Sequence, residues 1–224
     1  MLFLLQADTL NVPVTSAGEG LSLFSLIMKG GWVMIPIFIL SFIAVYIFIE
    51  RLLYIINNSK IDTTMVNSFK NSLSNADINN ARASLRTADS VYSRIFQQAM
   101  NRLGRPTRDI ESQIETAASI EINQMSKNLN YLGIVAGIAP MLGFIGTISG
   151  IIRIFYNISQ TDNISIGVIS GGLYEKMITS ASGLIVGVFA YTAYHILSGM
   201  IDRFAARLER EAFDFMNIIQ QPAK

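Results

Sequence analysis

The sequence predicts an all-α integral membrane protein with three transmembrane helices and long helical extensions into the cytoplasm. The chain of 224 residues is 51% hydrophobic and only 15% charged, whereas soluble domains carry about 25% charged residues. Its apolar residues are concentrated in three blocks, each long enough to cross a hydrocarbon core of about 30 Å as a helix. A charged stretch separates the first two blocks, which indicates a polar region outside the membrane.

The N-terminal part contains the first of these blocks. Residues 1–29 open with an apolar run that is too short for a signal peptide, and the apolar segment from Leu21 to Met28 is too short to span a membrane. We therefore expect an extracytoplasmic segment with a short interfacial helix, or a packing segment, at Leu21 to Met28. Residues 30–53 form the first predicted transmembrane helix. Trp32 lies at one end of it, where an amphipathic ring favours the membrane interface.

Residues 54–130 form a predicted cytoplasmic helical region. Asn75 or Asp77 is placed to cap a helix that continues to the Gly-Arg-Pro break before Thr107. Thr107 has the side chain of a good N-cap and is followed by acidic residues in the first turn. From there we expect one long helix to about Tyr156, half in water and half in lipid.

The C-terminal part contains the other two spans. We predict a second transmembrane helix at 131–156, a periplasmic loop at 157–172, a third transmembrane helix at 173–198 and a cytoplasmic amphipathic helix at 199–224. In the last of these, apolar residues recur alternately every four and three positions and predict a packing seam. The seam residues are Ile201, Ala205, Leu208, Ala212, Phe215 and Ile219.

The distribution of basic residues predicts the topology. The stretch 51–130 holds ten Lys and Arg residues and the tail from residue 200 holds four, whereas residues 1–30 and 153–172 hold one each. By the positive-inside rule, the N-terminus is periplasmic and the C-terminus cytoplasmic. We therefore expect a multi-pass protein of a bacterial inner membrane.

The second and third spans are built for close helix packing. Small or hydroxylated residues recur every third or fourth position from Ala136 to Gly150, which gives one helical face without bulk. Isoleucines cover much of the remaining surface and suit contact with lipid. Two glycine pairs here and one pair in the third span have the GxxxG spacing. The residues predicted to pack closely are Gly133, Gly137, Pro140, Gly143, Gly146, Gly150, Gly183 and Gly187.

Four residues are candidates for a proton path or lumen: Thr147, Glu175, Thr179 and Ser180. A carboxylate near the membrane is costly unless it pairs, takes up a proton or meets water, so Glu175 is either an ion ligand at a pore mouth or an ordinary interfacial acid. The hydroxyls either line a lumen or bond the carbonyl four residues back in their own helix.

Three stretches resemble the MotA/TolQ/ExbB proton-channel family in its ExbB/TolQ branch. They are GGWVMIPIFILSFIAVYIFIERLLYI at 30–56, LGIVAGIAPMLGFIGTISGIIRIF at 132–155 and EKMITSASGLIVGVFAYTAYH at 175–195. The second is close to the family pattern Ala-Pro-Leu-Leu-Gly-Leu-Leu-Gly-Thr-Val-x-Gly-Met and is the most specific. The resemblance extends over nearly the whole chain.

Residue by residue, the resemblance places the family's lumen threonine at Thr147 and its third-span glutamate at Glu175. The third-span threonine falls on Ser180, with Thr179 just before it. Which of these two hydroxyls faces the lumen stays open. Lys176 stands where the family usually has a small residue.

The resemblance implies the channel-forming subunit of a motor driven by the proton-motive force. It also implies a homopentamer around an ExbD/TolR-like single-span partner, which carries the proton and passes force to a TonB/TolA-like transducer and the outer membrane. The alternatives are a passive membrane scaffold, a self-contained ion channel, or a flagellar-stator-like or gliding motor subunit. The residues offer no pattern for an enzyme, a cofactor, a metal site or nucleic-acid binding.

Overall fold

The computed structural model describes residues 31–87, 90–161 and 166–220. Every regular element in these residues is an α-helix, which confirms the predicted fold class. The interfacial helix predicted within residues 1–29 lies outside the described residues. The helices are α2 (Met34–Asn58), α3 (Thr63–Ser74), α4 (Ile78–Arg86), α5 (Val91–Met100), α6 (Thr107–Ser126), α7 (Leu129–Thr161) and α8 (Ile166–Gln220).

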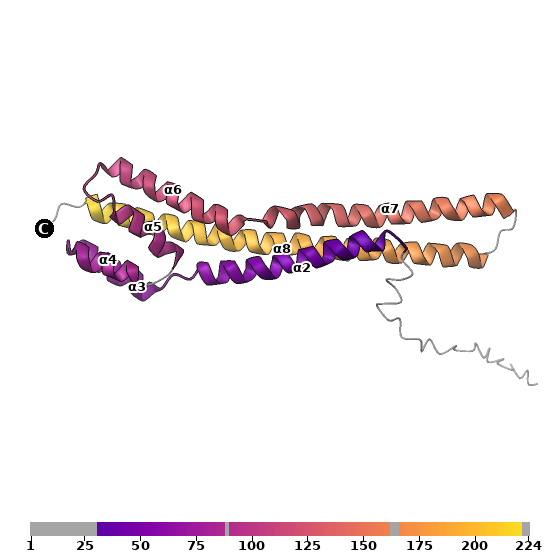
Figure 1. Ribbon diagram of the computed structural model, residues 1–224, viewed down its shortest axis with the longest axis horizontal. Coiled ribbons are helices and arrows are strands. Elements are labelled where there is room, and N and C mark those ends of the chain that lie inside the picture. Colours follow the sequence, from indigo (N-terminus) through magenta and orange to yellow (C-terminus); the bar gives the residue numbers. More distant parts are fainter. Residues whose placement is uncertain (1–30, 88–89, 162–165, 221–224) are drawn as a thin grey trace, which may run out of the picture.

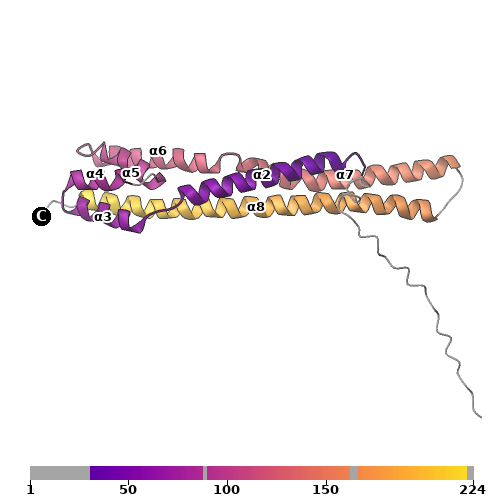
Figure 2. The same cartoon turned by 60° about the horizontal axis from the view of Figure 1, so that its bottom comes forward.

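The molecule is an elongated bundle of helices (Figure 1). One end is formed by the apolar stretches of α2, α7 and α8, and the other end is polar. At the apolar end α7 and the first half of α8 run side by side in opposite directions, and α2 lies along them (Figures 1 and 2). At the polar end α3 to α6 gather around the last part of α8. Three helical stretches are long and apolar enough to cross a membrane, as predicted: Met34–Ser74, Thr107–Gln160 and Ile169–Gln220.

The predicted loop at 157–172 is mostly helical, so this boundary was wrong. Helix α7 continues to Thr161 and α8 already begins at Ile166. The Asn, Ser and Gly residues of this stretch lower helix propensity, but propensity is a weak signal beside the packing of two antiparallel helices. Helix α8 then continues as one element of 55 residues, which confirms that the third span extends into the C-terminal amphipathic helix.

The polar region between the first two spans folds into four helices rather than two. Asp77 caps α4, as predicted, with its Oδ1 accepting the backbone N–H of Asn80 at 3.1 Å. The helix expected from there to the Gly-Arg-Pro break is divided, because Ser90 caps a new helix, α5, by accepting the N–H of Ser93 at 3.2 Å. The sequence signal of this second cap is the serine that directly precedes the apolar Val91.

The long helix expected from Thr107 is interrupted. Thr107 is the first residue of α6 rather than its cap, a position taken by Pro106. The helix ends at Ser126, and Asn128 follows in the left-handed region with a φ of +67°. Asparagine tolerates this conformation better than most residues, and α7 begins directly afterwards at Leu129.

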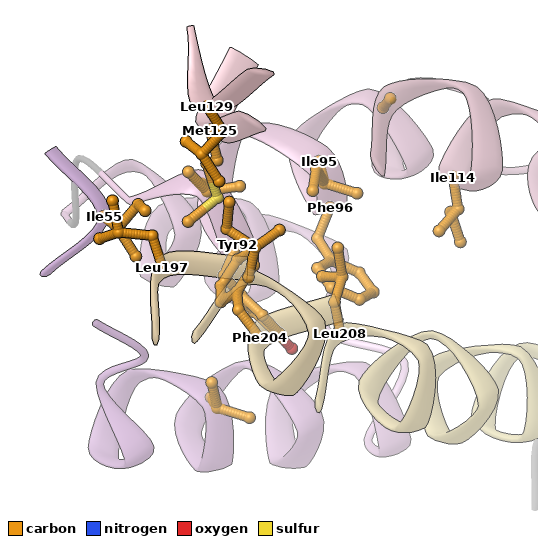
Figure 3. Close-up of a cluster of buried hydrophobic side chains, with 14 of the residues drawn as sticks. Ile55, Tyr92, Ile95, Phe96, Ile114, Met125, Leu129, Leu197, Phe204 and Leu208 are labelled. Carbon is orange, nitrogen blue, oxygen red and sulfur yellow. The ribbon is translucent and has the colours of Figure 1, made fainter. Parts of the chain in front are cut away.

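The polar bundle, by which we mean α3 to α6 and residues 201–220 of α8, has an aromatic core. Phe69, Tyr92, Phe96 and Phe215 are buried and contact one another, with ring centroids 4.3–6.5 Å apart. Figure 3 shows buried side chains of α2, α5, α6, α7 and α8 converging near this core. The predicted seam is confirmed: Ile201, Leu208 and Phe215 are buried, and Ala212 and Ile219 pack against the cluster.

Ionic contacts join the elements of the polar bundle. Lys70 of α3 pairs with Glu211 at 3.0 Å and Asp214 at 2.6 Å on α8. Burial lowers the pKa of Lys70, but hydrogen bonds to the two carboxylates and their charges outweigh this and raise it above its ordinary value. Arg94 of α5 pairs with Glu121 of α6 at 2.8 Å.

Arg51 anchors the polar end of α2. Its guanidinium is buried, and Nη1 donates to the backbone carbonyl of Gln124 at 3.2 Å, close to the end of α6. It also pairs with Glu50 and lies over the ring of Tyr54, 5.1 Å from the centroid. Because a basic group near a helix C-terminus satisfies its carbonyls, this contact fixes α6 against α2 just before the interruption at Asn128.

Candidate functional site

The candidate site lies on the α7–α8 hairpin, whose backbones touch through glycines. A Cβ added to Gly143 would lie 3.0 Å from the carbonyl oxygen of Ser180, and one added to Gly183 would lie 2.5 Å from that of Ala139. One at Gly187 would lie 2.5 Å from Cγ of Pro140. Side chains larger than hydrogen therefore do not fit along this line, in keeping with the small residues that membrane helices use for close approach.

Pro140 contributes to the same line. A proline inside a helix cannot bond the carbonyl four residues earlier, which here belongs to Ala136. This carbonyl lies against α8, 3.2 Å from a Cβ added to Gly187. The glycine therefore gives α8 direct access to a backbone oxygen that Pro140 leaves without its helical partner.

Gly133 and Gly137 do not take part in the hairpin contact. A Cβ added to either would meet no atom of the described residues within 4 Å. Of the glycines predicted to pack closely, these two thus have open space beside them within the described part of the chain, unlike Gly143 and Gly183.

Lys176 lies in a slot made by glycine. Its side-chain carbons occupy the space where a Cβ on Gly150 would stand, and its Nζ lies 3.5 Å from a Cβ added to Gly31. Gly31 lies shortly before Met34, the first residue of α2, and has a φ of +74°. The lysine side chain therefore crosses from α8 over α7 to the beginning of α2. The sequence contains a signal for this position, because a lysine within an apolar span is unusual.

Thr147 connects the two helices of the hairpin. Its hydroxyl lies 3.1 Å from the Gly143 carbonyl of its own helix and 3.4 Å from the Lys176 carbonyl of α8. The first contact is the bond to the residue four back that hydroxylated residues often make in membrane helices. The second joins α7 to the stretch that contains the other candidate residues.

Thr179 and Ser180 have different environments. Thr179 is 0% exposed, and its Cγ2 lies 2.7 Å from a Cβ added to Gly146, so it is enclosed between α7 and α8. Ser180 is only partly buried. Of the two hydroxyls, Ser180 is therefore the one that retains exposed surface in this chain.

Helix α2 covers one side of the hairpin. Val33, at the start of α2, and Met34 and Ile37 within it form a cluster with Leu142 and Val186 of the hairpin. Leu142 directly precedes the buried Gly143, and Val186 directly precedes the buried Gly187. The ring contact between Phe48 of α2 and Phe189, which precedes the buried Ala190, has a centroid distance of 5.8 Å and lies on the same side.

Thr147 and Ser180 lie on the opposite side of the hairpin. Each follows a buried contact residue, Gly146 and Thr179 respectively. Successive helical residues are about 100° apart, so residues before and after a contact position lie on opposite flanks. When two antiparallel right-handed helices face each other, the residues that directly follow the contact residues lie on the same side of the pair in both helices. We call this side, away from α2, the hydroxyl flank.

The side chain of Glu175 lies outside the described part of the structure. Its backbone belongs to α8, one residue before Lys176, whose carbonyl is near Thr147. The predicted roles of Thr147, Glu175, Thr179 and Ser180 in a proton path remain predictions, although the backbone brings all four positions to one level of the hairpin.

A cavity of about 390 Å³ lies where α6, α7 and α8 meet. It lies at the point where the backbone is interrupted at Lys127 and Asn128 between α6 and α7. Its lining includes Lys127, Asn128, Leu129, Tyr194, Ser198 and Asp202. Sequence analysis did not identify this site, and the signal that could have found it is the spacing of four between Tyr194, Ser198 and Asp202.

The family comparison covers both helices of this hairpin. The sequence model of the MotA/TolQ/ExbB proton channel family matches residues 87–210, more than half of the chain. The chain belongs to the MotA/TolQ/ExbB family. The matched residues include Thr147, Ser180, the close-packed glycines and the cavity, so the features described above lie within the segment that defines the family.

Individual members of the MotA/TolQ/ExbB family are related at modest identity. A putative biopolymer transport protein ExbB homolog of Methanothermobacter thermautotrophicus is 25% identical over 77% of this chain and 62% of its own length. The putative ExbB-like 1 protein of Synechocystis is 28% identical over 80% and 73%. The biopolymer transport protein ExbB of Salmonella typhimurium is 26% identical over 54% of each chain. The chain thus spans about half to three-quarters of the length of these relatives.

Proposed function

We propose that this protein is the channel-forming subunit of a motor that is driven by the proton-motive force, of the ExbB/TolQ type. The observation that carries the proposal is the hydroxyl flank. In a chain of a proton channel family, Thr147 and Ser180 lie on the side of a close-packed hairpin that α2 leaves uncovered. Such a flank can face a lumen while the isoleucine-rich surfaces face lipid.

The central proton carrier in this proposal belongs to another chain. Moving one charge across a membrane yields about 2.3 kcal/mol per 100 mV, and only a titrating group within the field can use this energy. On the hydroxyl flank, the described residues at the level of Thr147 offer hydroxyls and no carboxylate side chain. An acidic residue of an ExbD/TolR-like single-span partner meets this need, with Glu175 at the rim of the lumen.

Assembly into a homopentamer around that partner would bury part of the exposed apolar surface of the chain. Large side chains remain exposed on α7 and α8, for example Phe144 at 63% and Ile185 at 69%. Contacts with lipid and with neighbouring copies cover such groups in a membrane. Force from the assembled complex then passes to a TonB/TolA-like transducer.

The basic residues support an orientation in the inner membrane. The polar bundle contains most of them, whereas the connection between α7 and α8 is poor in them. By the positive-inside rule the polar bundle is cytoplasmic and the α7–α8 connection periplasmic. The hydroxyl flank then leads from the periplasmic side towards the cytoplasm.

Substitution of Thr147 tests the function. Thr147→Val keeps the shape but removes the hydroxyl, and leaving a buried polar partner unpaired costs about 1–3 kcal/mol. We expect proton flux through the reconstituted complex to fall about tenfold or more, with Thr147→Ser near normal. Ser180→Ala and Glu175→Gln should lower flux as well.

Native mass spectrometry of the same preparations separates a broken path from a broken complex. Helix contacts are distributed along the whole hairpin, so the complex should remain intact. Full flux in the double variant Thr147→Val/Glu175→Gln, in an intact complex, would contradict the proton path and favour a passive scaffold.

A further inference from the structure

The cavity at the junction of α6, α7 and α8 lies at the boundary between the apolar and polar ends. Helix α7 begins at Leu129, which lines the cavity, and the apolar part of α8 ends at about Leu197, next to Ser198. Its wall combines backbone of the helix interruption with hydroxyl, amide and charged side chains. A space of about 390 Å³ with such polar partners is large enough and polar enough to hold water molecules.

The same cavity opens on the hydroxyl flank. Tyr194, Ser198 and Asp202 each follow a buried contact residue of α8, namely Ala193, Leu197 and Ile201. Ser180, earlier in α8, likewise directly follows a buried contact residue, Thr179. The cavity and the candidate proton path therefore lie on one side of the hairpin, away from α2.

Asp202 gives the cavity a carboxylate that forms no ion pair within the described residues. No ion pair or hydrogen bond joins its carboxylate to another side chain among the residues in 31–87, 90–161 and 166–220. Lys127 also lines the cavity, but the two do not pair. The carboxylate of Asp202 is exposed, so it is accessible to cations in the cavity water.

We propose that this cavity is the cytoplasmic vestibule of the ion path, in which Asp202 attracts arriving cations and receives protons. The inference rests on the proposed function for the identity of the ion and for the direction of transfer. An excess proton carried by the water of the path as hydronium binds a carboxylate oxygen of Asp202 and leaves neutral water behind, and the protonated carboxyl group then releases the proton to bulk water. No other bond changes.

The physical basis is electrostatic focusing. A carboxylate in a recess of the surface raises the local concentration of cations and the rate at which they arrive. Ser198 and Tyr194 supply hydroxyls beside it that can hold the water through which a proton moves. Lys127 limits the field on the opposite wall, so its removal should strengthen the cation preference.

Thiol labelling tests the vestibule directly, because the chain contains no cysteine. Ser198→Cys is introduced into the full complex in inside-out membrane vesicles and treated with a cationic or an anionic impermeant methanethiosulfonate. We expect the cationic reagent to react about tenfold faster, relative to free thiol, with the preference lost in Ser198→Cys/Asp202→Asn. Ile196→Cys, before the contact residue Leu197 and thus on the α2 flank, is the matched control and should react slowly.

Two labelling outcomes would overturn the proposal. Absence of reaction at Ser198→Cys with either reagent would show that the cavity does not contain accessible water. Equal rates for the two reagents would remove the role of Asp202. Both outcomes are obtained without proton flux, so they are distinguishable from a failure of the Thr147→Val test.

Proton flux provides the second arm. Asp202→Asn should lower flux about tenfold while Asp202→Glu keeps most of it, with the complex intact by native mass. Glu209→Gln, which removes an exposed acid further along α8, should leave flux unchanged. Normal flux in Asp202→Asn would overturn the role of this residue in ion transfer.

Discussion

The apolar hairpin and the polar bundle share α8 but are held together by different means. In the hairpin, glycines allow the backbones of α7 and α8 to touch, and a threonine hydroxyl lies between them. In the polar bundle, large aromatic side chains fill the space between helices and ion pairs lie around them. One continuous helix therefore changes from backbone contact to side-chain contact along its length.

The difference follows from the solvent. In water, burial of apolar area stabilises the fold by roughly 25 cal/mol per Å², so large side chains are favourable in the core. Lipid tails are as apolar as leucine and provide no such driving force, which leaves close van der Waals contact and polar bonds. Bulk is thus stabilising in one half of α8 and destabilising in the other.

Removal of bulk from the polar bundle should have the largest effect. Phe96 is fully buried against Tyr92 and Phe215, and Phe96→Ala should destabilise the bundle by about 3–5 kcal/mol. Limited trypsin digestion should then cleave within residues 59–126 while the hairpin resists. Phe213→Ala, at a position that is 68% exposed, should digest like the unmodified protein. Similar digestion of both variants would contradict an aromatic core.

Addition of bulk to the hairpin should have the next largest effect. Gly183→Ala places a methyl group 2.5 Å from the Ala139 carbonyl, and such overpacking costs about 1–3 kcal/mol. The thermal midpoint of the detergent-solubilised complex should fall. Gly133→Ala adds the same group where no described atom lies within 4 Å. A comparable loss from Gly133→Ala would indicate that this glycine is instead packed between subunits.

Alkaline pH should produce the smallest effect, confined to the polar bundle. Burial, with the charge and hydrogen bond of Glu211, raises the pKa of Tyr92, and the carboxylate partners raise that of Lys70. Since folding favours the protonated form of both, their contribution is complete below about pH 10 and is lost as pH rises further. Near-ultraviolet circular dichroism of the aromatic cluster should show a falling thermal midpoint above this pH.

Two variants test whether Tyr92 and Lys70 cause this loss of stability at alkaline pH. Tyr92→Phe and Lys70→Met each remove one of the titrating groups and should make the midpoint less dependent on pH. A pH dependence that is unchanged in both would assign the effect to other residues.

The sequence alone was sufficient for the fold class, the three spans and the family. These depend on local patterns: long apolar runs have few alternatives to helices in a membrane, and the motif around Thr147 is contiguous in the sequence. The C-terminal seam was also predictable, because its period of three and four residues lies within one helix. The helix boundaries were less accurate, since the two helices of the hairpin support residues whose own propensity is low.

Only the tertiary structure decided which members of each pattern meet. Gly133 and Gly183 both belong to GxxxG pairs, but Gly183 touches a neighbouring backbone, whereas Gly133 faces open space among the described residues. Thr179 and Ser180 are adjacent and similar, yet Thr179 is enclosed and Ser180 is not. Sequence spacing fixes how residues are distributed around one helix. Which flank is covered depends on the rotation of each helix and on the position of α2, which arise from contacts between segments far apart in the chain.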